Sequence, residues 1–242
     1  MKKIINYNEI SIIYRNHVIL IKSKILLLNG KEFFMRNGKK IGLLVTGFAI
    51  AFAMVLGVKT KALAFNNGET FTYEKVKYQV TKLAKGENPA ICKVIGAEKD
   101  AEKITIFANP KYDGETLSCT SINNGAFSGN DDLTYVKISE SSKISNIPLN
   151  CFKDCDGLKT VIIGTPAVKV INKNAFKGCE SLKTVAIKNK TIKKASFKTN
   201  CFKGTTGVTI YAPSKSVAKK YASYATKRGA KEVKYGKYKA NF

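Results

Sequence analysis

The chain has 242 residues, 44% of them hydrophobic, and a formal net charge of +25. This is enough for one domain with a hydrophobic core. The only histidine, His17, lies in a segment that we expect to be missing from the exported protein, and this excludes Ser-His, Cys-His and His-metal chemistry.

Residues 1–34 precede a second methionine, Met35, and are rich in Ile, Asn, Lys and Tyr. Their apolar run, 18–28, is short and interrupted by lysines, which argues against a membrane span. We interpret 1–34 as a mis-called upstream extension, with translation starting at Met35. Lys31 and Glu32 can be encoded as AAG-GAG, a ribosome-binding sequence close upstream of Met35, which supports this interpretation.

Residues 35–64 have the pattern of a secretory signal peptide. A basic start is followed by an uncharged apolar run, 41–58, and by Ala62 and Ala64 in a small-x-small cleavage site. We therefore expect a secreted or cell-surface-associated protein cleaved after Ala64. The alternative is an uncleaved signal anchor, because a helix over 41–58 would span roughly 27 Å, close to a bilayer core. The chain shows no lipobox cysteine or sorting signal, so retention at a cell wall would depend on charge.

Residues 65–118 alternate apolar and polar positions between turn signals such as Asn66-Asn67-Gly68 and Asp113-Gly114. We predict a β-rich N-terminal cap, because stacked repeats need their open strand edges covered.

Four phenylalanines then recur at intervals of 25, 24 and 26 residues: Phe127, Phe152, Phe176 and Phe202. A period of this size indicates repeat units that bury their apolar faces only against one another. Each Phe has a bulky apolar residue five positions before it, and the first three have a Leu six positions after it. A Val-x-Ile that reads as a short strand comes next. The other predicted core residues are Ile122, Leu133, Ile147, Leu158, Ile171, Leu182 and Phe197.

The segments NCFKDCDGLKTVII (150–163) and NAFKGCESLKTVAI (174–187) resemble the BspA-like class of leucine-rich repeat. The resemblance covers about four units over 119–213, the last of them shortened. It departs from the repeat pattern at Asn130 and Thr205, where two units have cysteine. It implies a mostly β repeat solenoid with short turns and helical pieces, in a bacterial secreted or surface protein used for binding and adhesion.

Residues 214–242 are predicted to form a helical C-terminal cap and a basic tail. Ser214 is a suitable N-cap, 216–228 has an apolar stripe at helical spacing, and Gly229 is a suitable end. A basic amphipathic helix could instead bind a membrane surface, but the stripe is narrow and lacks Leu, Phe and Trp.

Six cysteines in an exported chain permit disulfides. Cys155 and Cys179 occupy equivalent repeat positions, which indicates small buried apolar residues. Cys92 and Cys119, in and next to the predicted cap, form the pair that we select as a possible disulfide. The sequence predicts no metal or other cofactor, since no histidine is left to complete a zinc site.

Lysines also recur in the repeats. Lys153, Lys177 and Lys203 directly follow a Phe, and Lys159 and Lys183 directly follow a Leu. These rows are either a solvated face that keeps the protein soluble or a groove for an anionic polymer, such as teichoic acid or a sulfated glycan.

Two functions remain open. The first is a non-catalytic, adhesion-type module that binds a protein or an envelope or host ligand. The second is a basic envelope-associated protein that binds an anionic glycan or cell-wall polymer. Export, and the lack of aromatic residues between the lysines, argue against nucleic acid. A membrane would be contacted only through an uncleaved segment 41–58.

Overall fold

The computed structural model describes residues 10–14, 17–21, 66–85, 87–239 and 242. It divides into two compact units, Met1–Ala62 and Leu63–Phe242. In the first unit β1 (Ile10–Tyr14) and β2 (His17–Ile21) pair in an antiparallel manner. The predicted signal peptide 35–64, with its segment 41–58 and its cleavage residues Ala62 and Ala64, lies outside the described residues.

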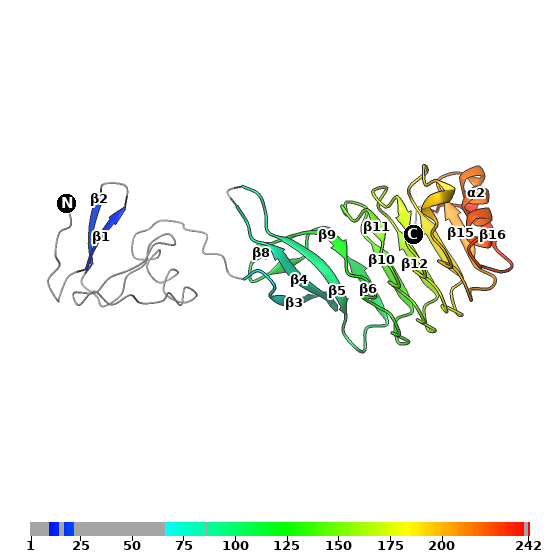
Figure 1. Ribbon diagram of the computed structural model, residues 1–242, viewed down its shortest axis with the longest axis horizontal. Helices are drawn as coiled ribbons and strands as arrows, with labels where there is room; N and C mark the ends of the chain where they lie inside the picture. Colours follow the sequence, from blue (N-terminus) through cyan, green and yellow to red (C-terminus); the bar gives the residue numbers. More distant parts are fainter. Residues whose placement is uncertain (1–9, 15–16, 22–65, 86, 240–241) are drawn as a thin grey trace. The chain divides into compact units, whose positions relative to one another are not determined.

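The second unit is built on a parallel sheet of six strands in the order β16-β15-β14-β12-β10-β6 (Figure 1). The strands pair in one register, so that Val136, Val161 and Val185 are direct neighbours. These valines and the isoleucines two positions later face the core because side chains alternate along a strand. The strands are β6 (Lys103–Ile106), β10 (Tyr135–Ile138), β12 (Thr160–Ile163), β14 (Thr184–Ile187), β15 (Thr209–Ala212) and β16 (Lys234–Lys237).

This sheet extends beyond the predicted repeat stretch 119–213 at both ends. β6 lies inside the segment predicted as an N-terminal cap, and it pairs in parallel with β10. β16 lies in the segment predicted as a basic tail, and it pairs in parallel with β15. Neither strand is accompanied by a phenylalanine in the repeat position, which is why the phenylalanine period does not include them.

The four phenylalanines form one continuous stack. The ring centroids are 5.2 Å apart for Phe127 and Phe152, 5.4 Å for Phe152 and Phe176, and 5.1 Å for Phe176 and Phe202. These separations are close to the spacing of neighbouring strands, so each unit adds one ring to the stack. All eleven predicted core residues are buried, the most exposed being Ile122 at 7%.

Each turn before a phenylalanine has a left-handed residue two positions upstream. Asn150, Asn174 and Asn200 have φ of 54°, 57° and 56°, and Gly125 fills the equivalent position with φ 64°. Asparagine tolerates this conformation better than other side chains do. The chain therefore bends at this position in each unit. The Asn174 side-chain amide donates to the Asn150 side-chain oxygen of the preceding unit at 3.1 Å and thereby links two turns.

A smaller sheet precedes the repeats, in the order β3-β4-β5-β9. Its first three strands are antiparallel, and β5 and β9 are parallel. The strands are β3 (Thr70–Tyr73), β4 (Val76–Lys82), β5 (Ile91–Ala97) and β9 (Ser118–Ile122). The short pairs are β7 (Lys111–Tyr112) with β8 (Glu115–Thr116) and β11 (Asn146–Ile147) with β13 (Val170–Ile171).

Beside the short 3-10 helix η1 (Lys194–Ser196), one α-helix, α2 (Lys215–Thr226), is described. The predicted N-cap is confirmed, since the Ser214 hydroxyl accepts a hydrogen bond from the Val217 amide at 3.3 Å. Tyr221 is buried against the last units, and its hydroxyl donates to the Asn189 carbonyl at 2.9 Å. The apolar face of α2 is therefore occupied by the protein itself.

The outer face of the main sheet is partly covered by Phe242. Its ring lies 4.9 Å from the Tyr211 ring, and its carbonyl accepts a hydrogen bond from Lys137 Nζ at 2.9 Å. Tyr211 belongs to β15 and Lys137 to β10, so this contact reaches over the strands between them, in agreement with the position of the C-terminus in Figure 1. It helps to explain why Ile162 and Ala186, which point to the same face, are fully buried.

Candidate binding surface

The predicted lysine positions are brought together by the stacking of the units. The Lys153, Lys177 and Lys203 carbonyls each accept a hydrogen bond from a backbone amide of the preceding unit, at 2.9, 2.7 and 2.8 Å. Their side chains therefore form one row, which we call the turn row. Lys159 and Lys183 are exposed and lie beside the strands, and Lys183 Nζ donates to the Thr206 carbonyl at 3.1 Å.

Acidic side chains border the turn row. Lys153 pairs with Asp154 at 2.6 Å, and its own side chain is only 33% exposed. The position four residues after each of the first three repeat phenylalanines holds an exposed carboxylate. These residues are Asp131, Asp156 and Glu180, and they lie between the turn row and the lysines that follow each Leu. An anionic polymer along the turn row would therefore meet carboxylates as well as lysines, which weakens this row as a polyanion groove.

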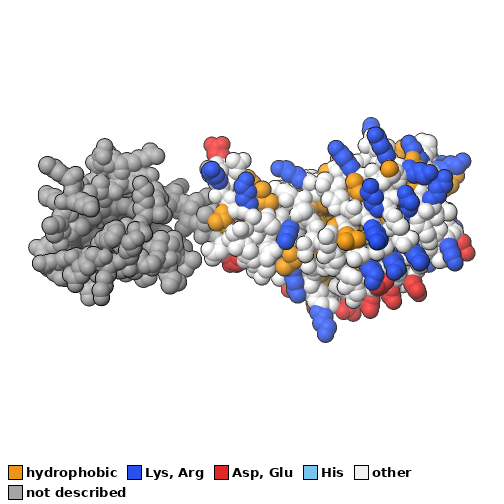
Figure 2. Space-filling view, viewed as in Figure 1, with side chains coloured by type: hydrophobic (Ala, Val, Ile, Leu, Met, Phe, Trp, Pro, Cys, Tyr) orange, Lys and Arg blue, Asp and Glu red, His pale blue; other side chains and the backbone are white. Residues whose placement is uncertain are grey.

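The positive charge is instead concentrated in the C-terminal part of the stack of units. Residues 113–164 contain 4 lysines and 7 acidic residues, a formal net charge of −3. Residues 165–242 contain 19 Lys and Arg and 2 acidic residues, a formal net charge of +17. Figure 2 shows the basic side chains spread over the C-terminal units and the acidic ones gathered along the lower margin.

The segments that return from one strand to the next turn carry many of these charges. We call their exposed lysines the return lysines; they are Lys169, Lys173, Lys190, Lys193, Lys194 and Lys198. None of them forms an ion pair within residues 66–85 and 87–239. The search for recurring positions missed these lysines because they do not recur at one position of the repeat. A comparison of the net charges of the two halves of the repeat region would have found them.

The cysteines are buried free thiols. Burial raises the pKa of Cys155 to about 11 and that of Cys201 to about 12, and it raises the pKa of Cys151 well above its usual range. Protonated thiols are weak nucleophiles at neutral pH, so these three cysteines do not form an activated site.

Cys92 and Cys119, the predicted disulfide pair, are direct partners in the register of β5 and β9. They stand there as two free, fully buried thiols. The hydrogen bond with Cys119, followed by burial, raises the pKa of Cys92. Side chains of parallel partners project in the same direction, which suits thiol contact better than disulfide geometry.

Cys155 and Cys179 have a structural role between units. Their sulfurs lie 2.8 Å from the carbonyl oxygens of Phe127 and Phe152 in the preceding unit. At the equivalent position Thr205 donates to the Phe202 carbonyl of its own unit at 3.0 Å. The cysteine thiol therefore makes a hydrogen bond between two units, whereas the threonine hydroxyl makes one within its own turn.

Replacing Cys179 by alanine is expected to lower the free energy of unfolding by about 1–3 kcal/mol, because the buried Phe152 carbonyl loses its thiol donor. Cys179→Ser keeps a donor and should cost less. Urea unfolding followed by circular dichroism measures both. Equal losses for alanine and serine would show that the sulfur acts by packing alone.

Residues 113–226 match the family model of the BspA type leucine-rich repeat region, in 6 copies. The repeat region of this chain is of that type. Its fold is a leucine-rich-repeat fold of mostly strands. The match begins before the predicted boundary at 119 and ends after the one at 213.

Three solved structures are similar to parts of the chain. A leucine-rich repeat protein from Bacteroides ovatus is 24% identical, with a TM-score of 0.46, over 59% of this chain and 37% of that one. One from Bacteroides capillosus is 17% identical, with a TM-score of 0.47, over 60% and 99%. A leucine rich cell surface protein from Faecalibacterium prausnitzii is 21% identical, with a TM-score of 0.39, over 71% and 44%. No curated protein matches the chain.

In the part of the chain that the structure describes, no helix is both long and apolar enough to cross a membrane. The same residues bring no three His, Cys, Asp or Glu side chains together as a metal site.

Proposed function

We propose that this protein is a non-catalytic binding module that acts outside the bacterial cell, secreted or held at its surface, and that its partner is an anionic polymer. The repeats form a solenoid, closed at one end by the sheet β3-β4-β5-β9 and at the other by α2. The predicted signal peptide 35–64 supports the location, and the family supports a binding role.

One observation carries the choice of partner: the formal net charge of +17 over residues 165–242 beside −3 over residues 113–164. A charge needed only for solubility has no reason to concentrate on one end of the stack. A concentrated positive surface raises the local density of acidic ligands and speeds their association. Teichoic acid and sulfated glycans are the polymers of this kind that an exported bacterial protein can meet.

We expect binding to depend steeply on salt. If about five lysines contact a polyanion, affinity should fall roughly 10²–10³-fold between 50 and 200 mM NaCl, by the counterion-release behaviour of nucleic-acid ligands. Biolayer interferometry of the full chain on immobilised heparin and on lipoteichoic acid measures this dependence, with neutral dextran as the control.

The same measurement separates the alternatives. Tight binding to a protein partner that barely changes with salt would favour protein recognition by an adhesion-type module. Failure to bind either polymer at 50 mM NaCl would contradict an anionic partner.

A further inference from the structure

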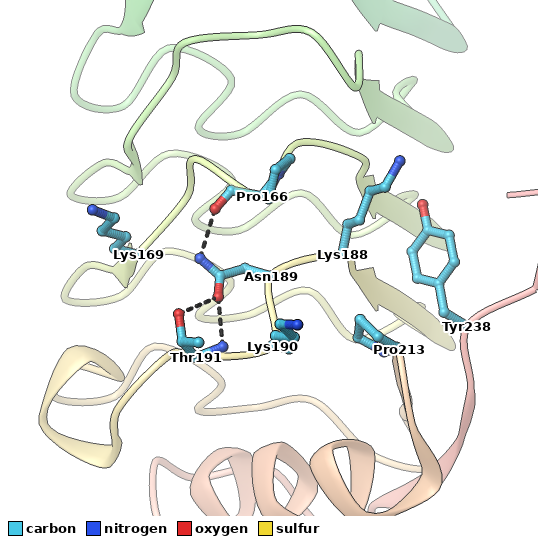
Figure 3. A pocket seen from close by; sticks show the side chains of 8 residues that line it. All are labelled: Pro166, Lys169, Lys188, Asn189, Lys190, Thr191, Pro213 and Tyr238. Carbon is cyan, nitrogen blue, oxygen red and sulfur yellow. Dashed lines mark hydrogen bonds between the residues drawn. The ribbon is translucent and has the colours of Figure 1, made fainter.

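A pocket of about 540 Å³ opens where the C-terminal ends of β12, β14 and β15 meet the segment after β16 (Figure 3). Pockets of this size hold small molecules in many proteins. The residues that line it are Pro166, Lys169, Lys188, Asn189, Lys190, Thr191, Pro213 and Tyr238.

The centre of the pocket wall is held in place by Asn189. Its amide nitrogen donates to the carbonyls of Pro166 at 2.7 Å and Val168 at 2.9 Å. Its side-chain oxygen accepts from the Thr191 amide at 2.7 Å and from the Thr191 hydroxyl at 2.9 Å (Figure 3). Every polar group of this side chain is used: the nitrogen bonds to the preceding unit, and the oxygen holds Thr191 of its own segment. Asn189 therefore shapes the pocket, and other residues must recognise the ligand.

The charged groups of the pocket favour an anion. Lys169, Lys188 and Lys190 come from two successive units and surround it on different sides (Figure 3). Lys188 is paired with Glu140, whose pKa is lowered by this hydrogen bond. Lys169 and Lys190 are exposed and have no ion-pair partner among the described residues. Two positive charges thus remain for a ligand.

The remaining residues that line the pocket can pack against the ring of a bound ligand. Pro166, Pro213 and the Tyr238 ring supply flat apolar surfaces beside the lysines. The Tyr238 hydroxyl is buried and has no hydrogen-bond partner among the described residues. The hydroxyl has no access to solvent, so the ring and not the hydroxyl of Tyr238 faces the pocket. A sugar offers a C–H face for these apolar surfaces.

We propose that this pocket binds an acidic sugar, one that carries a carboxylate or a sulfate. The acidic group pairs with Lys169 and Lys190, and the ring lies against Tyr238. This proposal rests on the proposed function and narrows it to an anionic glycan. The pocket recognises one acidic sugar of the glycan, while the surrounding lysines attract the polymer as a whole.

The test uses two disaccharides as probes, a sulfated uronate–glucosamine disaccharide of the host type and an unsulfated glucuronate disaccharide of the bacterial type. Cellobiose is the neutral control. Titration of the full chain, followed by ¹H–¹⁵N NMR, should shift the amide signals of residues 188–191 with an acidic probe but not with cellobiose. Whichever acidic probe binds more tightly identifies the source of the ligand.

The double variant K169Q/K190Q should weaken binding of the acidic disaccharide about tenfold, since two exposed charge contacts are lost. The matched control K159Q/K183Q removes the same charge elsewhere and should change the affinity less than about twofold. All exchanged lysines are exposed, so the melting temperatures should stay close to that of the parent protein.

Equal losses in the two double variants would overturn the pocket and leave only general charge attraction. Polymer binding with steep salt dependence, but no binding of either disaccharide, would overturn the pocket while the proposed function stands. If neither polymer nor disaccharide binds, the proposed function fails as well.

Discussion

Replacing Phe176 by alanine is expected to lower the free energy of unfolding by about 3–5 kcal/mol, the usual cost of removing a buried aromatic ring. Phe176 has a stacked ring on each side, Phe152 at 5.4 Å and Phe202 at 5.1 Å, and is fully buried. Each repeat unit contacts only its neighbours, so a cavity here weakens both interfaces of the unit. Urea unfolding followed by circular dichroism measures the loss, because the chain has no tryptophan.

Phe127 provides the comparison. Its ring stacks on Phe152 alone among the described aromatic residues, so Phe127→Ala should cost less than Phe176→Ala. Phe176→Leu should lie between the parent protein and Phe176→Ala because it fills part of the cavity. A loss below about 1 kcal/mol for Phe176→Ala would show that the stack relaxes around the gap and that the strands carry the stability.

The phenylalanine stack could be predicted from the sequence because every stacked unit gives this side chain the same environment. The same side chain is therefore selected at the same interval. The ends of the sheet were not accessible in this way. Beside β6 the position equivalent to Leu133 is filled by the buried Ala101. β16 has the exposed Tyr235 where the inner strands have a buried Val or Ile. End strands have one neighbour instead of two, so their side chains follow other constraints.

Local backbone conformation was predictable from the sequence, but side-chain partners were not. A bend at Asn174 follows from the residue type, whereas its hydrogen bond to Asn150 depends on how the units are stacked. The lysine rows show the same limit. Their recurrence predicted that Lys153, Lys177 and Lys203 align, but the pairing of Lys153 with Asp154 depends on rotamers and could not be read from the period.

Neutralising the lysines of the proposed binding surface is expected to weaken polymer binding strongly. The quadruple variant K173Q/K193Q/K194Q/K198Q neutralises four return lysines on the basic part of the stack, all of them exposed. A lysine close to an anionic surface contributes on the order of 1 kcal/mol, so the four together should weaken heparin binding about 10²–10³-fold. Biolayer interferometry at 50 mM NaCl measures the change.

The control variant K82Q/K111Q/K143Q/K159Q also removes four exposed lysines, but from residues 66–164. Both variants have the same formal net charge, so any difference in affinity reports where the polymer lies and not how much charge the protein carries. We expect a loss of about tenfold or less for the control, because charges more than a Debye length from the ligand are screened. Equal losses would mean that the polymer is held by net charge alone, and the separation of charge along the stack would then have no part in binding.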